Sequence, residues 1–168
     1  MAKIAIIGLG SVGASTALSL IHQRVQATLL LVDTNSTLRD AQAITQVRAS
    51  THREASQADV VVITAGAKYT PGETSIQHLY QKISILKSIL TETNPFNPNT
   101  ILIIVANPVD LLTTLAQDIS GLSRPKVFGI GTCLESARLR DEVSRLSGRR
   151  VDGYVVGVKG EYWCEEAD

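Results

Sequence analysis

The segment Gly8-Leu9-Gly10-Ser11-Val12-Gly13 is the most informative part of the sequence for predicting the fold. It directly follows an apolar run at residues 3–7 and opens a helical pattern. In such a strand–turn–helix, the first glycine allows a tight turn and the second lets a pyrophosphate approach the backbone without a Cβ in the way. The third lets helix and strand pack closely, and the free amides at the helix start, around Ser11 and Val12, face the phosphates. We therefore expect a dinucleotide-binding turn.

A carboxylate follows at the end of the next apolar run, residues 28–32. Asp33 lies 20 residues after Gly13, where it can bond both ribose hydroxyls of an adenosine and would repel a 2′-phosphate. This spacing favours NAD over NADP as the cofactor. The alternative is an ordinary tight strand–helix turn together with an aspartate that ends its strand and caps the next helix.

Further apolar runs extend the pattern in both directions, and they are apolar almost throughout rather than alternating. Parallel strands that are buried on both faces have this pattern. The predicted strands are residues 3–7, 28–32, 60–64 and 100–105, with weaker ones at 46–49 and 126–129. We expect a doubly wound α/β fold with a parallel sheet of about six strands, the Rossmann arrangement.

Helical patterns lie between these strands. Besides the helix after Gly10, they cover residues 36–44, 76–90, 109–120 and 133–147. Lys82 and Lys87 are expected on the solvated face of their helix. A last strand is predicted at residues 154–158.

Composition excludes several classes of function. The 168 residues carry 16 Lys+Arg and 16 Asp+Glu, so nothing in the net charge favours nucleic acid or an anionic membrane. The sequence contains no run of 18 consecutive apolar residues, which is the length a helix needs to span a bilayer. Cys133 and Cys164 are too far apart for a metal clip and are expected to be free thiols of a cytoplasmic protein. The three histidines are expected at the surface, without a metal site.

Four ordered motifs resemble the lactate/malate dehydrogenase family. They are Thr64-Ala65-Gly66-Ala67, Gly72-Glu73-Thr74, Ala106-Asn107-Pro108-Val109-Asp110 and Leu134-Glu135-Ser136-Ala137-Arg138-Leu139-Arg140. The resemblance implies hydride transfer between NAD(H) and a small 2-hydroxy or 2-oxo acid, with Thr64, Ala65, Gly66 and Asn107 beside the cofactor. The Glu-Thr pair is more like the lactate branch, and Tyr69 stands where the malate branch carries an arginine for a second carboxylate.

The resemblance also assigns substrate-binding residues. Asn107 would lie next to the nicotinamide and the substrate oxygen; its alternative role is a helix cap in an Asn-Pro turn. Arg138 would clamp the substrate carboxylate with its planar guanidinium; its alternative is a solvated basic face shared with Arg145 and Arg149.

Three departures from the family pattern affect catalysis. Lys159 replaces the acid/base histidine, and an ammonium with an ordinary pKa near 10.4 is a poor proton shuttle at neutral pH. Glu135 stands for the aspartate that orients that histidine, although it also completes a capping-box pattern with Thr132, which we favour. Ser75 stands where a mobile loop should carry a carbonyl-polarising arginine. We expect most of the hydride-transfer rate to be lost.

Residues 1–148 are thus predicted to form the dinucleotide-binding domain, and residues 149–168 a remnant of the substrate domain with an unmatched polar tail. The short segment after Asp33 makes the family's usual dimer doubtful. The alternative to an impaired enzyme is a non-catalytic NAD-binding module that forms a homo-oligomer or binds a full-length relative.

Overall fold

A computed structural model describes residues 1–35 and 47–157 of the chain. Its six-stranded sheet has the order β3-β2-β1-β4-β5-β6, and every neighbouring pair is parallel. The strands are β1 (Ala2–Ile7), β2 (Ala27–Val32), β3 (Val47–Ala49), β4 (Val60–Ile63), β5 (Ile101–Ile104) and β6 (Val127–Gly129). The predicted doubly wound fold is confirmed, and the strand order reverses direction between β1 and β4.

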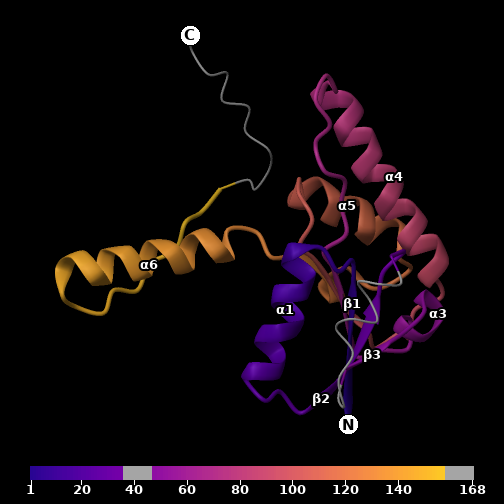
Figure 1. The fold of residues 1–168 in the computed structure, drawn as a ribbon, viewed down its shortest axis with the longest axis horizontal. Coiled ribbons are helices and arrows are strands. Elements are labelled where there is room, and N and C mark those ends of the chain that lie inside the picture. Colours follow the sequence, from indigo (N-terminus) through magenta and orange to yellow (C-terminus); the bar gives the residue numbers. More distant parts are fainter. Residues whose placement is uncertain (36–46, 158–168) are drawn as a thin grey trace.

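The helices lie on both faces of the sheet, apart from the last one, which projects away from it (Figure 1). They are α1 (Ser11–His22), α3 (His52–Ala55), α4 (Ser75–Thr93), α5 (Val109–Ile119), the 3-10 turn η1 (Arg124–Lys126) and α6 (Cys133–Ser147). The last predicted helix has the bounds of α6, whereas α4 is longer than predicted and α3 was not predicted. The helix predicted at residues 36–44 lies outside the described residues.

Two cores, one on each face, explain why the strands are apolar throughout. Successive strand residues point to opposite faces of the sheet. Ile7, like other fully buried strand residues on its face, packs in one cluster with Leu86 of α4 and Leu112 of α5. Its neighbour Ile6 packs on the other face in a second cluster with Ala17 of α1. A strand buried on both faces has no position left for a polar side chain.

Local signals define where the helices begin and end. The Thr74 hydroxyl accepts the Gln77 amide N–H while the Gln77 side chain accepts the Thr74 N–H, a capping box that starts α4. Gly148 ends α6 in the left-handed conformation with φ +66°. A β-branched or bulky residue at that φ would be strained.

The prediction of a strand at residues 154–158 is wrong for residues 154–157, the part that the structure describes. Residues 151–157 contain no strand; instead, their backbone is bonded by side chains of α6. The Val155 N–H donates to the Ser136 hydroxyl at 3.0 Å, and the Val151 N–H donates to the Ser144 hydroxyl at 2.9 Å. Tyr154 and Val156 point outward, 78% and 89% exposed. Their apolar pattern suggested a buried strand, but the helix satisfies the backbone and no neighbouring strand is present among the described residues.

Within the described part of the chain, no helix is long and apolar enough to cross a membrane.

Candidate cofactor site

A cleft opens at the carboxyl edge of the sheet, where β1 and β4 lead to opposite sides. Such a reversal point is where doubly wound folds bind ligands. The cleft has a volume of about 430 Å³. Its walls come from the loops after β1, β2 and β4, from α4 and from the start of α3: Ile7, Gly8, Gly10, Val32, Asp33, Thr34, His52, Thr64, Ala65, Gly66, Ile85, Ser88, Ile89 and Glu92. The structure therefore brings Gly8, Gly10, Asp33, Thr64, Ala65 and Gly66, all predicted from the sequence, into one cavity.

Two of the glycines in the turn are required by close packing. Gly8 has φ +96°, and a Cβ on it would lie 2.5 Å from the backbone nitrogen of Ala65. A Cβ on Gly13 would lie 1.9 Å from the carbonyl oxygen of Gly8 and 2.7 Å from the hydroxyl of Thr64. The loops after β1 and β4 and the first turn of α1 therefore touch one another through these two positions.

Gly10 differs from them, because a Cβ there would meet nothing within 4 Å. The backbone at Gly10 borders the open cleft, and so does that of Gly66, whose Cβ would also be free of contacts. No side chain caps the start of α1, so its first amides remain available to an anion. The geometry fits a dinucleotide: packed glycines set the turn, and Gly10 leaves space at a helix N-terminus.

The Thr64 side chain is used to brace the turn. Its hydroxyl donates to the Gly8 carbonyl at 2.6 Å, and the amides of Thr64 and Ala65 donate to the Ile7 carbonyl at 3.0 and 3.1 Å. Gly8 in turn donates its N–H to Val32. The ends of three neighbouring strands, β2, β1 and β4, are thus tied together at the cleft.

Asp33 is anchored by backbone amides. One carboxylate oxygen accepts the Leu9 N–H at 2.5 Å, and the other accepts the Asn35 N–H at 2.7 Å. Asp33 therefore orders the glycine turn and its own loop, whereas the next helix, which the structural alternative has it cap, lies outside the described residues. Each oxygen has a second lone pair, so a carboxylate held in this way can still accept from ribose hydroxyls. This ordering role is compatible with cofactor binding.

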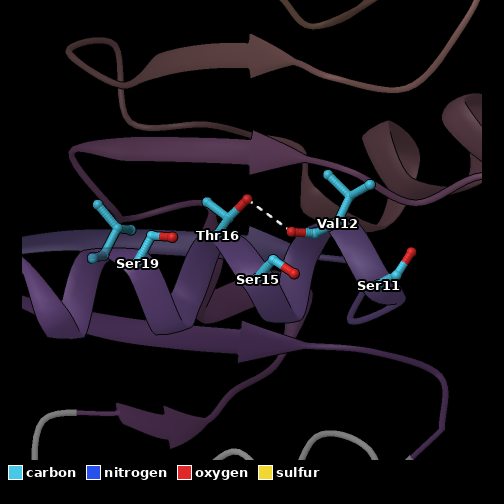
Figure 2. Close-up of a pocket in the computed structure, with 6 residues that line it drawn as sticks. Ser11, Val12, Ser15, Thr16 and Ser19 are labelled. Carbon is cyan, nitrogen blue, oxygen red and sulfur yellow. Dashed lines mark hydrogen bonds between the residues drawn. The ribbon is translucent and has the colours of Figure 1, made fainter. Parts of the chain in front are cut away.

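A second hollow lies outside this cleft, on the solvent side of α1 (Figure 2). Ser11, Val12, Ser15, Thr16 and Ser19 line it, and the Thr16 hydroxyl donates to the Val12 carbonyl of its own helix at 2.8 Å. The side chains of Ser11 and Val12 are thus exposed on the helix surface. Only their backbone, at the start of α1, is placed to serve a cofactor.

Asn107 follows β5 at the same edge of the sheet and is exposed. The N-cap of α5 is Pro108, and no side chain caps that helix, so the alternative role of Asn107 as a helix cap is wrong. The Asn107 amide is therefore not used to start the helix.

The predicted capping box at the start of α6 is also wrong. No side chain caps α6, because the Thr132 hydroxyl donates to the Val155 carbonyl at 2.5 Å instead. Glu135 is half-buried and Arg138 is exposed, both on a helix that projects from the sheet (Figure 1). Lys159 lies outside the described residues, so its pairing with Glu135 stays a prediction.

Two expected surface residues are buried. His78 is 4% exposed and Lys82 is 7% exposed, and both face the loop that leads into α4. Desolvation lowers the pKa of Lys82, while the nearby Glu73 carboxylate acts to raise it. Their spacing with Leu86 and Leu90, four residues apart each time, was the signal for a shared buried face. Tyr69, on the same loop, is 54% exposed.

Comparison with known proteins agrees with this geometry. A family model described as the NAD-binding domain of lactate/malate dehydrogenase matches residues 2–129. L-lactate dehydrogenase A of Rhizopus oryzae is 38% identical over 95% of this chain and 54% of its own length; an L-lactate dehydrogenase of Clostridium botulinum (strain Loch Maree) is 35% identical with the same coverage.

Solved structures show the same relation. A lactate dehydrogenase from a deep-sea metagenome library of the Medee basin has a TM-score of 0.85 and 31% identity, covering 95% of this chain and 55% of its own. The lactate dehydrogenase of Cryptosporidium parvum, solved with lactic acid and NAD, has a TM-score of 0.83 and 27% identity at the same coverage. The chain spans about half the length of these relatives. It belongs to the lactate/malate dehydrogenase family, and it carries that family's NAD-binding domain.

Proposed function

We propose that this chain binds NAD(H) in the cleft between β1 and β4 as the cofactor half of an L-lactate dehydrogenase-type oxidoreductase whose own hydride transfer is impaired. The observation that carries the proposal is the open backbone at Gly10, framed by the packed glycines and by the anchored carboxylate of Asp33. NAD(H), when bound, supplies the hydride chemistry. The start of α1 would hold the pyrophosphate and Asp33 the adenosine ribose.

The substrate side would be formed by Asn107, Tyr69 and Arg138. Arg138 is exposed, as a clamp for the carboxylate of a 2-hydroxy or 2-oxo acid requires. Proton transfer would fall to Lys159 with Glu135, and Ser75 offers no positive charge to a carbonyl. Losing a positioned acid/base costs about 10²–10⁴ in rate and losing one electrostatic donor about 10²–10³. We therefore expect binding of the cofactor to exceed what catalysis remains.

Calorimetric titration with NADH, and with NADPH as the competitor, tests the cofactor site. Asp33→Ala should weaken NADH binding and reduce its discrimination against NADPH. The matched control is Asp59→Ala, because Asp59 also accepts a backbone amide, from Lys3 at 2.8 Å, but lies outside the cleft residues. Equal NADH affinity in the two variants, or no NADH binding at all, would remove the proposal.

Turnover of pyruvate with NADH tests the catalytic part. The unaltered chain should be slow, and Lys159→His combined with Ser75→Arg should raise the rate if the remaining site is assembled. A kcat of the unaltered chain within the ordinary range of about 1–10³ s⁻¹ would show that catalysis is not impaired.

A second candidate function is a non-catalytic module that associates with another copy or with a full-length relative, in the cytoplasm. It is favoured by apolar side chains left exposed on α6 and the segment after it: Leu134, Leu139, Leu146, Tyr154 and Val156. Light scattering of the purified chain, alone and mixed with a full-length L-lactate dehydrogenase, tests whether the chain associates with itself or with such a relative. A monomer that forms no complex would exclude this candidate.

A further inference from the structure

A cluster of titratable side chains is buried where the loop at residues 67–74 meets α4. His78 places its Nδ1 3.2 Å from a carboxylate oxygen of Glu73, and both side chains are only about 5–6% exposed. The edge of the Tyr69 ring packs on His78, with ring centroids 5.5 Å apart and an interplanar angle of 74°. We name Tyr69, Glu73 and His78 the loop latch.

The contacts of the latch connect the loop to itself and to the helix. The Glu73 oxygen that faces His78 also accepts the Thr70 N–H at 3.2 Å. The Tyr69 hydroxyl donates to the backbone carbonyl of Glu73 at 2.5 Å. The loop therefore closes on its own backbone through Tyr69 and Glu73, and it touches the first turn of α4 through the His78–Glu73 ion-pair contact, in which His78 Nδ1 makes no hydrogen bond.

Stability alone does not account for these residues. His78 continues the buried stripe that runs through Leu86 and Leu90, where a leucine would pack without any polar group to desolvate. Burying a histidine beside a carboxylate is costly unless the pair is well bonded, and an apolar replacement of similar volume is often neutral or better. Lys82, one turn further, adds another buried polar group. What the latch supplies instead is one defined loop conformation.

We propose that Glu73 and His78 are positioning residues that preset the loop at residues 67–74 and orient Tyr69 for a bound 2-oxo acid. The inference rests on the proposed function, in which this loop lies on the substrate side of the cofactor. Its consequence is a loop that is held in place before any ligand arrives, in contrast to the mobile loop that the resemblance implies, so that ligand binding need not supply the cost of ordering it.

Hydrogen exchange of the full chain without ligand tests the latch directly. His78→Leu and Glu73→Ala should each speed exchange of the Thr70 amide about tenfold or more, because its bond to the carboxylate is charge-assisted. Glu73→Gln keeps an acceptor and should restore most of the protection. The matched control is Glu142→Gln, because Glu142 also pairs with a cation, Arg145 at 2.5 Å, but lies on α6, outside both the cleft and the loop.

Urea unfolding of the same variants shows that they fold, and Thr70 protection unchanged in both His78→Leu and Glu73→Ala would overturn the latch. The substrate side is tested with oxamate, an unreactive isostere of pyruvate, titrated into the NADH-loaded chain. His78→Leu should weaken oxamate binding and leave NADH affinity unchanged, since His78 lies outside the cleft. Oxamate binding that is absent or insensitive to His78 would overturn the positioning role. Absence of NADH binding alone would instead reject the proposed function, while the exchange data still decide the latch.

Discussion

The sheet domain, residues 2–129, and the α6 arm, residues 130–157, are held together by different forces. In the sheet domain, side chains such as Leu30 and Leu102 are fully buried, and two apolar clusters cover both faces. In the α6 arm, the buried residue of the helix is Ser136, and leucines such as Leu146 are exposed. The sheet domain is therefore folded by apolar burial, and the α6 arm by helix side chains that hydrogen-bond the backbone returning along it.

The bonds of the arm follow one stripe of α6. Thr132, Ser136, Arg140 and Ser144 lie four residues apart, and each bonds the backbone between Val151 and Val155. A hydrogen bond contributes about 0.5–1.5 kcal/mol net, whereas a buried leucine side chain contributes about 1.5–3 kcal/mol. The arm is therefore expected to open at a lower free energy than the sheet domain does.

The largest expected effect comes from truncating a core side chain. Leu102→Ala should lower the free energy of unfolding by about 2–5 kcal/mol, because Leu102 is 0% exposed in the middle of the sheet. Leu146→Ala, at 70% exposure on the arm, should change it by less than about 0.5 kcal/mol. Urea denaturation followed by circular dichroism measures both. Equal effects would mean that the arm has an apolar core of its own.

Within the sheet domain, the two kinds of glycine should separate stability from binding. Gly13→Ala should destabilise the chain by about 1–3 kcal/mol, because its Cβ would lie 1.9 Å from the Gly8 carbonyl oxygen. Gly10→Ala should leave the stability nearly unchanged and weaken NADH binding, because its Cβ would enter the open cleft. Denaturation and NADH titration of both variants check this. A stable Gly13→Ala protein would contradict the close packing of α1 on the turn.

A smaller, local effect is expected in the arm. Ser136→Ala removes the acceptor of the Val155 N–H, so exchange of that amide should speed by about 5–10-fold while the urea midpoint stays the same. Ser19→Ala, an exposed serine of α1, is the control. A drop in the midpoint after Ser136→Ala would show that the arm unfolds together with the sheet.

The smallest effect concerns one exposed ion pair in each region. The Arg48 guanidinium, with help from the Ser50 hydroxyl, lowers the pKa of Glu54, and the Arg145 guanidinium lowers the pKa of Glu142. A lowered carboxyl pKa contributes stability above the unfolded value, about 4.3, and that contribution is lost as the pH falls through the folded value.

Glu54→Gln should therefore slightly reduce the urea midpoint near neutral pH and flatten its decline below about pH 4.3, whereas Glu142→Gln should leave the global midpoint unchanged. Urea unfolding midpoints measured at several pH values between about 3 and 7 check the direction of this change. A midpoint that falls with acid more steeply in Glu54→Gln than in the unaltered chain would contradict it.

Much of the fold could be predicted from the sequence, because its signals are local. Strand residues such as Ile6 and Ile7 are apolar in succession, and Gly8, Gly10 and Gly13 have spacing that only a tight strand–helix turn explains. The sequence could not assign residues whose partners are distant. Thr132 and Glu135 match a capping box, yet the Thr132 hydroxyl bonds Val155, 23 residues further along the chain.

The amino-acid sequence alone specifies the alternation of strands and helices, the glycine turn with Asp33 after it, and the family to which the chain belongs. These follow from residue types and from their spacing along the chain, which the sequence states directly. Three features become visible only in the folded chain: Asp33 also anchors Leu9, His78 is buried beside Glu73, and residues 151–157 return along α6 rather than join the sheet. Burial and hydrogen bonding between such segments depend on which surfaces meet after folding, and no local pattern specifies that.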